Sequence, residues 1–490
     1  MLTYTLDNHG KIPLYEQLYR AIKIDITNGT LKANDKLPSK RSLAKHLGIS
    51  IVTVETSYQQ LKAEGYIYSQ TKKGFFVANI KPYRPPVKKT VRLVSTPTSM
   101  PGETKPTLNL SNNQTNSETF PFATWSKLVR QVLNNCQNEL VTPSPSKGVP
   151  LLRQTIVNHL NDYRGMAVDP KQIIIGAGTE CLYTLLIQLL GLDKTVALEE
   201  PSYPKITEIY RQFNINLIYI PMENDGLDTA QLKKSTADIV HLSPSHQFPT
   251  GAILYISKRY ELLSWASQGD RYIIEDDYDS EFRFQGLPIP SLQEIDSSGK
   301  VIYINTFSKS LASTLQISYL ILPPQLLDTF EEKLSFYNNT VSNLEQYTLA
   351  YFIQEGYFEK HLNRMRLFYQ KKRDELIHRL MTSPLNKRIS IHEQESGLHF
   401  ILHIQSDRSE QTICQLAKKH GLQMTPLSRY YRCQNIHSDK DFIINYANIT
   451  SPDIDKIINI FFANYYLIIS KTTFFPNITK DTIDKVQVFL

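Results

Sequence analysis

The stretch INTFSKSLASTLQISYL, residues 304–320, sets one lysine between two short apolar runs. These runs, KVIYINT at 300–306 and ISYLILP at 317–323, are rich in β-branched and aromatic residues and have the length of buried strands. Lys309 follows the first run and is flanked by serines. Because ligands of open α/β sheets bind at the carboxyl ends of the strands, the stretch predicts a sheet with a lysine at its ligand-binding edge.

Five further apolar runs of similar length precede this stretch and alternate with segments of helical period. They are QIIIGAG at 172–178, TVALEEP at 195–201, INLIYIP at 215–221, DIVHLSP at 238–244 and RYIIEDD at 271–277. Strands that alternate with helices predict a mostly parallel α/β sheet that is covered on both faces. After about residue 325 long amphipathic helices follow, and then GLHFILHIQ (397–405) and FIINYANIT (442–450) predict the strands of a smaller α+β domain.

The ends of the expected strands carry residues that suit a phosphorylated aromatic ring. Gly178 and Thr179 open a helix directly after a strand, where backbone N–H groups bind phosphate well. Tyr203 follows the next strand and can stack on a flat ring. Each of these two features alone is a weak indication of a cofactor site. They become informative together with the residues that follow the next two strands.

Asp276 and Tyr278 come after a third strand, and Lys309 comes after a fourth. A carboxylate can hold a pyridinium proton, a phenol can bond a ring oxygen, and a desolvated lysine can form an imine with an aldehyde. A lone lysine after a strand is more often a solvated surface residue. The four features in this order favour a cofactor site over that alternative.

Positive charge is concentrated at the start of the chain. Residues 1–92 contain 16 Lys and Arg against 6 Asp and Glu, a net charge of +10, whereas the whole chain of 490 residues carries +7. The rest of the chain therefore carries −3. A basic head on a slightly acidic body indicates a polyanionic partner for the head, and a merely soluble basic domain is the alternative.

The basic head has the pattern of a winged helix-turn-helix. Helices are expected at 13–29, 37–48 and 50–65, and a hairpin is expected at 66–78. Ser39 and Ser50 are the expected N-caps of the second and third helices. The third helix of such a unit lies in the major groove of DNA. The segment LPSKRSLAKHLGISIVTVETSYQQLKAEGYI resembles the GntR family almost position by position, which implies a double-stranded DNA operator as partner.

The expected DNA contacts lie on the second and third helices and at the wing tip. They are Lys40, Arg41, Ser50, Thr53, Thr56, Tyr58, Lys72 and Lys73. Ile49, Val52, Val54 and Leu61 are instead expected in the core. Ile51 stands where the family often has an arginine that touches DNA, so the operator sequence or its affinity differs from the family pattern. A winged helix used only for protein contacts is the alternative.

The body resembles the fold-type I, pyridoxal 5′-phosphate-dependent aminotransferases over about residues 107–465. The motifs GMAVDPKQIIIGAGTE, SPSHQFPTG, IIEDDYDSEFRF and TFSKSL are most similar to the MocR/GabR regulators, in which a GntR head is fused to such a body. The resemblance implies pyridoxal 5′-phosphate as cofactor and Lys309 as its Schiff-base lysine. The further cofactor-binding residues that it implies are Gly178, Thr179, Tyr203, Asp276, Tyr278 and Ser308.

Two positions depart from the aminotransferase pattern. Phe248 replaces an asparagine that contacts the ring oxygen, and Gln316 replaces an arginine that pairs with the cofactor phosphate. Glutamine cannot reproduce a bidentate charged contact. The loss is expected to cost on the order of 1–3 kcal/mol, or about ten- to a hundredfold in affinity. We expect weakened cofactor binding, and a body that has lost the cofactor is the alternative.

The sequence also predicts the organisation of the chain. The predicted parts are a winged helix-turn-helix at 1–78, a proline-rich basic linker at 79–106, an aminotransferase-like body at 107–470 with a small subdomain from about 330, and an extension without an assigned role at 471–490. No apolar run of about 20 residues predicts a membrane span, and the four cysteines show no metal-binding spacing. A cytoplasmic protein without a structural metal is expected.

These observations predict a homodimeric transcriptional regulator whose body senses an amino compound or pyridoxal 5′-phosphate itself. Arg429, Arg432 and Lys205 are the candidates for binding the carboxylate of the effector. Amino acids, an alanyl dipeptide, a taurine-like amine and the vitamin itself are all compatible effectors. A working aminotransferase with an accessory DNA-binding domain is the alternative function, and a cofactor-free scaffold is a third.

Overall fold

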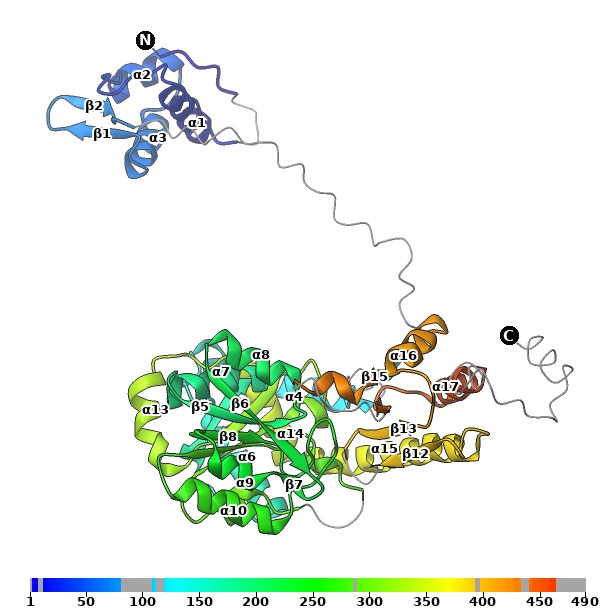
Figure 1. Ribbon diagram of the computed structural model, residues 1–490. Coiled ribbons are helices and arrows are strands. Elements are labelled where there is room, and N and C mark those ends of the chain that lie inside the picture. Colours follow the sequence, from blue (N-terminus) through cyan, green and yellow to red (C-terminus); the bar gives the residue numbers. More distant parts are fainter. Residues whose placement is uncertain are drawn as a thin grey trace, which may run out of the picture. The chain divides into compact units, whose positions relative to one another are not determined.

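The computed structural model describes seven stretches of the chain, which belong to two compact units, Met1–Glu103 and Thr104–Leu490 (Figure 1). The described stretches are 2–7, 12–80, 108–111, 119–284, 289–392, 397–432 and 440–463. The predicted extension at 471–490, and all but the first two residues of the predicted linker at 79–106, lie outside them.

The N-terminal unit consists of three helices and a hairpin, as the sequence predicts. Its elements are α1 (Leu14–Thr27), α2 (Lys40–Leu47), α3 (Ile51–Ala63), β1 (Ile67–Gln70) and β2 (Gly74–Val77). Ser39 and Ser50 are N-caps, because their side chains accept hydrogen bonds from the backbone N–H groups of Ser42 and Thr53. Gly48 ends α2 with a φ of 68°, a left-handed conformation that favours glycine.

Tyr58 belongs to the core of this unit. Its side chain is fully buried, its ring meets Phe75 edge-on with the centroids 5.1 Å apart, and its hydroxyl donates to the carbonyl oxygen of Pro38 at 3.1 Å. Val54, Tyr58 and Leu61 follow each other at the i, i+4, i+7 spacing of one helix face, and all three are buried. The prediction that Tyr58 contacts DNA is therefore wrong.

The first turn of α3 is more exposed than the sequence predicts. Val52, expected in the core, is 69% exposed because it lies off the buried face of the helix. Ile51 is exposed as well, whereas Ile49, just before the helix, packs partly buried against the core. The start of α3 thus presents two apolar side chains to solvent.

The larger unit is built on an eight-stranded sheet in the order β4-β11-β10-β9-β8-β5-β6-β7. The strands are β4 (Ile173–Ala177), β5 (Thr195–Glu200), β6 (Asn216–Glu223), β7 (Gly226–Leu227), β8 (Ile239–Leu242), β9 (Tyr272–Asp276), β10 (Val301–Thr306) and β11 (Ile317–Ile321). All seven predicted strands are present, and the structure adds β7. β11 is antiparallel to both neighbours and β7 is antiparallel to β6, while the other pairs are parallel. The mostly parallel sheet is confirmed.

Helices cover both faces of this sheet (Figure 1). They are α4 (Phe122–Asn135), α5 (Gln137–Val141), α6 (Pro150–Arg164), α7 (Gly178–Leu190), α8 (Pro204–Gln212), α9 (Thr229–Lys234), α10 (Ile256–Ser267), α11 (Leu292–Ile295), α12 (Phe307–Ser310), α13 (Leu327–Leu334) and α14 (Asn343–Gln354). Ile174 packs in a cluster with Leu182 of α7, and Ile175 packs in another with Leu349 of α14. Successive residues of one strand thus fill the cores on opposite faces.

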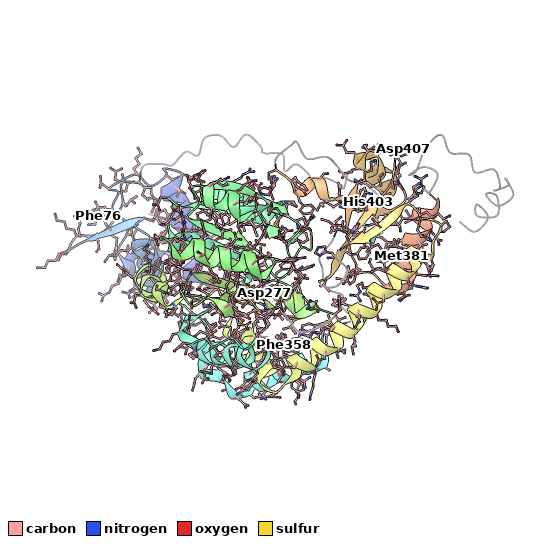
Figure 2. The ribbon with its side chains drawn as sticks, turned by 60° about the horizontal axis from the view of Figure 1, so that its bottom comes forward. Phe76, Asp277, Phe358, Met381, His403 and Asp407 are labelled. Carbon is pink, nitrogen blue, oxygen red and sulfur yellow. The ribbon has the colours of Figure 1, made fainter. Side chains whose placement is uncertain are left out.

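The small subdomain combines helices with an antiparallel sheet in the order β12-β13-β16-β15. Its elements are α15 (Tyr357–Thr382), β12 (Ile389–His392), β13 (His399–Ile404), α16 (Glu410–Lys419), β15 (Thr425–Pro426), β16 (Asp441–Asn445) and α17 (Ser451–Ala463). In Figure 2, Phe358 and Met381 label the two ends of α15. This arrangement confirms the predicted α+β subdomain.

Short elements complete the larger unit. They are β3 (Leu108–Asn109), which pairs with β14 (Leu422–Gln423), and the 3₁₀ turns η2 (Pro170–Gln172), η3 (Ser280–Phe282), η4 (Pro324–Leu326) and η5 (Leu427–Tyr430). Within the part of the chain that the structure describes, no helix combines the length and the apolar character needed to cross a bilayer.

Candidate functional site

A cavity of about 330 Å³ lies where β4, β5, β8, β9 and β10 end. All seven residues that the sequence predicts around a cofactor line it: Gly178, Thr179, Tyr203, Asp276, Tyr278, Ser308 and Lys309. Parallel strands bring their carboxyl ends to one edge of the sheet, so these seven residues, up to 131 positions apart in sequence, share one cavity.

Lys309 is held in the short helix α12, directly after β10. The Thr306 hydroxyl accepts a hydrogen bond from the backbone N–H of Ser308 at 3.2 Å and so caps this helix. Burial lowers the pKa of Lys309 to about 8, and the nearby Asp279 carboxylate opposes this shift. Near neutral pH a fraction of this lysine is the free amine, which is the nucleophilic form.

Asp276, the last residue of β9, is a buried carboxylate with one engaged oxygen. The hydroxyl of Tyr183 donates a hydrogen bond to its Oδ2. Its Oδ1 is buried and has no hydrogen-bond partner among the residues that the structure describes. Burial raises the pKa of Asp276 to about 7. A buried acceptor of this kind is costly unless a donor meets it, and a ring N–H would supply one.

Aromatic rings form another part of the cavity wall. Phe248 meets Tyr203 and Tyr278 edge-on, with centroids 5.6 Å and 6.4 Å apart. The Tyr278 hydroxyl lies 3.2 Å from Nδ1 of His246, and the same nitrogen lies 2.8 Å from Oδ2 of Asp279. Phe248 therefore places an apolar ring where an asparagine would offer a hydrogen bond.

The turn from β4 into α7 forms a concave backbone surface. Gly178 opens the 13-residue helix α7 with a φ of 81°, which favours glycine. Thr179 follows it, and both line the cavity together with the exposed Gln316. The start of a helix presents free N–H groups and a positive dipole end, so this turn suits a phosphate.

The three residues that are candidates for binding the effector carboxylate do not all line this cavity. Lys205 lines the cavity and forms an ion pair with Glu180, which also lines it. Arg429 is exposed and Arg432 donates from Nη2 to Glu208 at 3.4 Å, and neither lines the cavity. Lys205 is thus the candidate within reach of a ligand bound there.

Several polar residues of this cavity were not predicted from the sequence, among them Tyr183, His241 and Glu199. The hydroxyl of Tyr210 lies 3.0 Å from Nδ1 of His241, and burial lowers the pKa of His241 to about 3, so this imidazole is neutral. Glu199 accepts a hydrogen bond from the backbone N–H of Ser243 at 3.1 Å, and burial raises its pKa to about 8. Their positions inside buried strands made His241 and Glu199 look like strand residues only.

In the N-terminal unit, the remaining expected DNA contacts are at least partly accessible. Lys40 forms an ion pair with Glu55 at 2.5 Å across α2 and α3. Arg41 is exposed at the start of α2, and Lys72 and Lys73 are exposed in the turn of the hairpin. Cations thus lie on α2 and in the turn of the hairpin, where they can contact phosphates if α3 enters a groove of DNA.

Two family models match the chain. The model described as bacterial regulatory proteins, gntR family, matches residues 14–77, and the model described as aminotransferase class I and II matches residues 105–461. The probable rhizopine catabolism regulatory protein MocR of Rhizobium meliloti is 31% identical over 468 residues, which are 93% of this chain and 94% of MocR. The chain belongs to the MocR-type regulators. It is therefore a transcriptional regulator with a GntR-type head and an aminotransferase-like body.

Other relatives of this MocR-type chain are regulators as well. The uncharacterized HTH-type transcriptional regulator YdeL of Bacillus subtilis is 38% identical, over 92% of this chain and 96% of YdeL. The HTH-type pyridoxine biosynthesis transcriptional regulator PdxR of Corynebacterium glutamicum is 29% identical, over 88% of this chain and 91% of PdxR.

Solved aminotransferases share the fold of the body of this MocR-type regulator. The multiple substrate aminotransferase of Thermococcus profundus aligns with a TM-score of 0.65 at 21% identity, covering 79% of this chain and 94% of its own. A kynurenine aminotransferase of Pyrococcus horikoshii aligns with a TM-score of 0.64 at 22% identity, and the alignment covers 74% of this chain and 93% of the aminotransferase chain. These alignments confirm the aminotransferase fold.

Proposed function

We propose that this MocR-type regulator holds pyridoxal 5′-phosphate as a Schiff base on Lys309, and that it senses an amino compound or pyridoxal 5′-phosphate itself in the cavity at the strand ends. One observation carries the proposal: Lys309, with its lowered pKa, and the buried carboxylate of Asp276, one oxygen of which bonds no described residue, line the same cavity. Few other ligands would use both an amine nucleophile and a buried acceptor.

Each end of the cofactor has a matching group. Oδ1 of Asp276 would accept the hydrogen bond of the ring nitrogen, and Tyr183 would keep the carboxylate oriented through Oδ2. The turn at Gly178 and Thr179 would hold the phosphate. Tyr203, which is 41% exposed, would cover the ring from the open side.

Lys309 would attach the cofactor covalently. Its Nζ would supply the amine that condenses with the aldehyde group of the cofactor, with loss of one water. When bound, the cofactor supplies an electron-withdrawing ring and a carbon that exchanges one amine for another. An amino effector would compete with Lys309 for that carbon and would leave the Lys309 side chain as a free amine.

Gln316 would make the phosphate site weaker than one with an arginine. It is exposed, lines the cavity beside the turn at Gly178, and offers a neutral amide. A regulator that must respond to changing concentrations of its ligand benefits from moderate affinity, because a saturated site reports nothing. Lys205 is the candidate for the carboxylate of an amino effector, because it lines the cavity whereas Arg429 and Arg432 do not.

The head would bind an operator through α3 and the cations beside it. Ser50 caps α3, and Thr53 and Thr56 lie on its first turns. Arg41 and Lys73 would contact phosphates. Two copies of the chain in a homodimer would present two such heads, so the operator would contain two half-sites.

The test combines spectroscopy with DNA binding on the full chain. Pyridoxal 5′-phosphate is titrated in while the visible absorption of an imine is followed, and a duplex selected from a random library is then bound with and without cofactor and a panel of amines. We expect an imine band, and an operator affinity that changes when an amine shifts that band. A duplex that binds identically under all conditions, with no imine band, would refute the sensing role while leaving the DNA-binding role intact.

A further inference from the structure

A second cavity, of about 320 Å³, shares none of its lining residues with the first. Its walls come from α6, η3, β10, β11 and α15. Tyr303 and Tyr319 are buried in its inner part, whereas Asp162, Tyr163 and Asn363 are exposed around it. A ligand therefore has a route to it from solvent.

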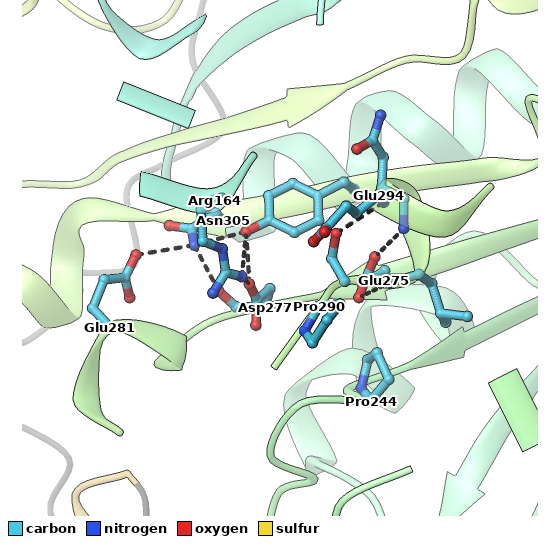
Figure 3. Close-up of polar contacts among 12 residues, drawn as sticks. Arg164, Pro244, Glu275, Asp277, Glu281, Pro290, Glu294 and Asn305 are labelled. Atoms are coloured by element: carbon cyan, nitrogen blue, oxygen red, sulfur yellow. Dashed lines mark hydrogen bonds and ion pairs between the residues drawn. The ribbon is translucent and has the colours of Figure 1, made fainter. Parts of the chain in front are cut away.

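A network of charged and polar groups joins this cavity to the end of β9 (Figure 3). Arg164 donates to Oδ2 of Asp277, and the Tyr303 hydroxyl donates to the same oxygen at 2.6 Å. Asn305 donates from Nδ2 to the backbone oxygen of Asp277 at 2.9 Å. Asp277 directly follows Asp276, so the end of β9 lines the first cavity through Asp276 and bonds lining residues of the second through Asp277.

The carboxylate of Glu281 is an acceptor in the wall of this cavity. Asn305 donates to Oε1 of Glu281 at 3.2 Å, but Oε2 of Glu281 is buried and has no hydrogen-bond partner among the described residues. Burial raises the pKa of Glu281, and the neighbouring Asp277 raises it further. Leaving a carboxylate oxygen buried without a donor is unfavourable, so a ligand that brings a donor, above all an ammonium group, would bind there favourably.

Cations lie close to this acceptor. Nε of Arg366 donates to the backbone oxygen of Glu281 at 2.6 Å, which sets the Arg366 guanidinium against the same part of the wall. Arg283 is two residues beyond Glu281 and also lines the cavity. The charges of the lining balance, with the cations Arg164, Arg283 and Arg366 against the anions Asp162, Glu281 and Glu359. A lining with both positive and negative groups favours a ligand that carries both a positive and a negative charge.

We infer that this cavity is a second small-molecule site, which binds a zwitterion of amino-acid size with its ammonium group at Glu281 and its carboxylate at Arg366 and Arg283. The volume is at the lower end of that of small-ligand pockets, about 300–1,000 Å³, which suits a ligand of amino-acid size. The site is independent of the cofactor proposal, since none of its groups lines the first cavity.

The test uses the full chain with Lys309→Ala and no pyridoxal 5′-phosphate, so that no imine can form. The probes are the twenty L-amino acids and γ-aminobutyrate, measured by calorimetry. We expect at least one to bind with one site per chain. In this background Glu281→Gln, which keeps the side-chain shape, is expected to weaken binding tenfold or more. Asn363 is an exposed residue of the lining, and Asn363→Phe would narrow the cavity with a larger side chain. This variant is also expected to weaken binding tenfold or more.

Two controls separate this site from the first cavity and from misfolding. Lys360→Phe, an exposed position of α15 outside the lining, should leave binding unchanged. Lys205→Ala alters the first cavity and should also leave it unchanged. Melting temperatures check that each variant is folded. The inference would be overturned if no probe binds. It would also be overturned if Lys205→Ala abolishes binding while Glu281→Gln and Asn363→Phe both preserve it. Either result leaves the Schiff-base proposal standing, because Lys309 is absent from the assay.

Discussion

Tyr183 of α7 donates the hydrogen bond that fixes Oδ2 of Asp276 at the end of β9. Tyr183 lies one helical turn beyond Thr179, so the helix that opens at the proposed phosphate site also orients the proposed ring-nitrogen partner. Its ring meets His241 edge-on with centroids 5.1 Å apart, and both side chains are buried. The position of the carboxylate is thus determined by packing as well as by the strand.

Replacing Tyr183 by phenylalanine should weaken cofactor binding. The hydrogen bond from Tyr183 lowers the pKa of Asp276, so its loss should raise that pKa above about 7 and disfavour the carboxylate that pairs with a ring N–H. A charged hydrogen bond of this kind is worth about 1.5–3 kcal/mol, which predicts a roughly ten- to hundredfold higher Kd in an absorbance titration. Tyr210→Phe removes a neighbouring buried hydroxyl that bonds His241 and serves as control. Equal effects of the two variants would contradict a specific role for Tyr183.

Replacing Gln316 by arginine should strengthen cofactor binding. The variant restores a cation beside the turn at Gly178, and a bidentate contact to phosphate should lower the Kd by about ten- to a hundredfold. Thr314→Arg adds the same charge two residues away, at an exposed position outside the cavity lining, and should have a much smaller effect. If both arginines act alike, general attraction rather than a phosphate contact at residue 316 accounts for the change.

Imine formation should depend on pH through Lys309. Burial lowers the pKa of this lysine from its usual 10.5 to about 8, so the free amine gains population as the pH rises toward 8 and saturates above it. The rate of imine formation should therefore rise about tenfold per pH unit below pH 8 and level off near pH 9. Stopped-flow absorbance at several pH values measures it. A rate that still rises tenfold per unit above pH 9 would mean that Lys309 titrates like a solvated lysine.

Arg41 and Lys73 should contribute to operator binding through phosphate contacts. Replacing either by alanine should weaken binding to all duplexes by a similar factor and lower the slope of log K against log salt by about 0.9. Fluorescence anisotropy at several salt concentrations measures the slope. Lys62→Ala, at the exposed far end of α3, is the control and should leave it unchanged. A slope unaffected by Arg41→Ala would place that side chain away from the DNA backbone.

The strands and the residues that line the cavity at their ends could be predicted because each rests on local sequence. Seven apolar runs gave seven strands, and the rule that ligands bind at carboxyl ends selects Asp276 and Lys309 without any knowledge of strand order. The N-caps Ser39 and Ser50 are equally local signals. What these residues bind remains a proposal, which the experiments above address.

The rest depends on contacts that local sequence does not encode. Tyr58 was misplaced because a tyrosine near a recognition helix suits either DNA or the core, and only the packing against Phe75 decides. Tyr183 sits in an apolar helix that gives no sign of a polar role. Glu281 and Arg366 are 85 residues apart, and only the packing of α15 along η3 brings them together.

The most direct test of the account is borohydride reduction of the full chain with pyridoxal 5′-phosphate, followed by peptide mass mapping. Reduction converts an imine into a stable secondary amine, so the attached lysine is identified by mass. We predict a single pyridoxyl adduct, on Lys309, that is suppressed when an effective amine is present. Equal labelling of exposed lysines with none on Lys309 would contradict the Schiff-base proposal, and the cavity at the strand ends would then have to bind a different ligand.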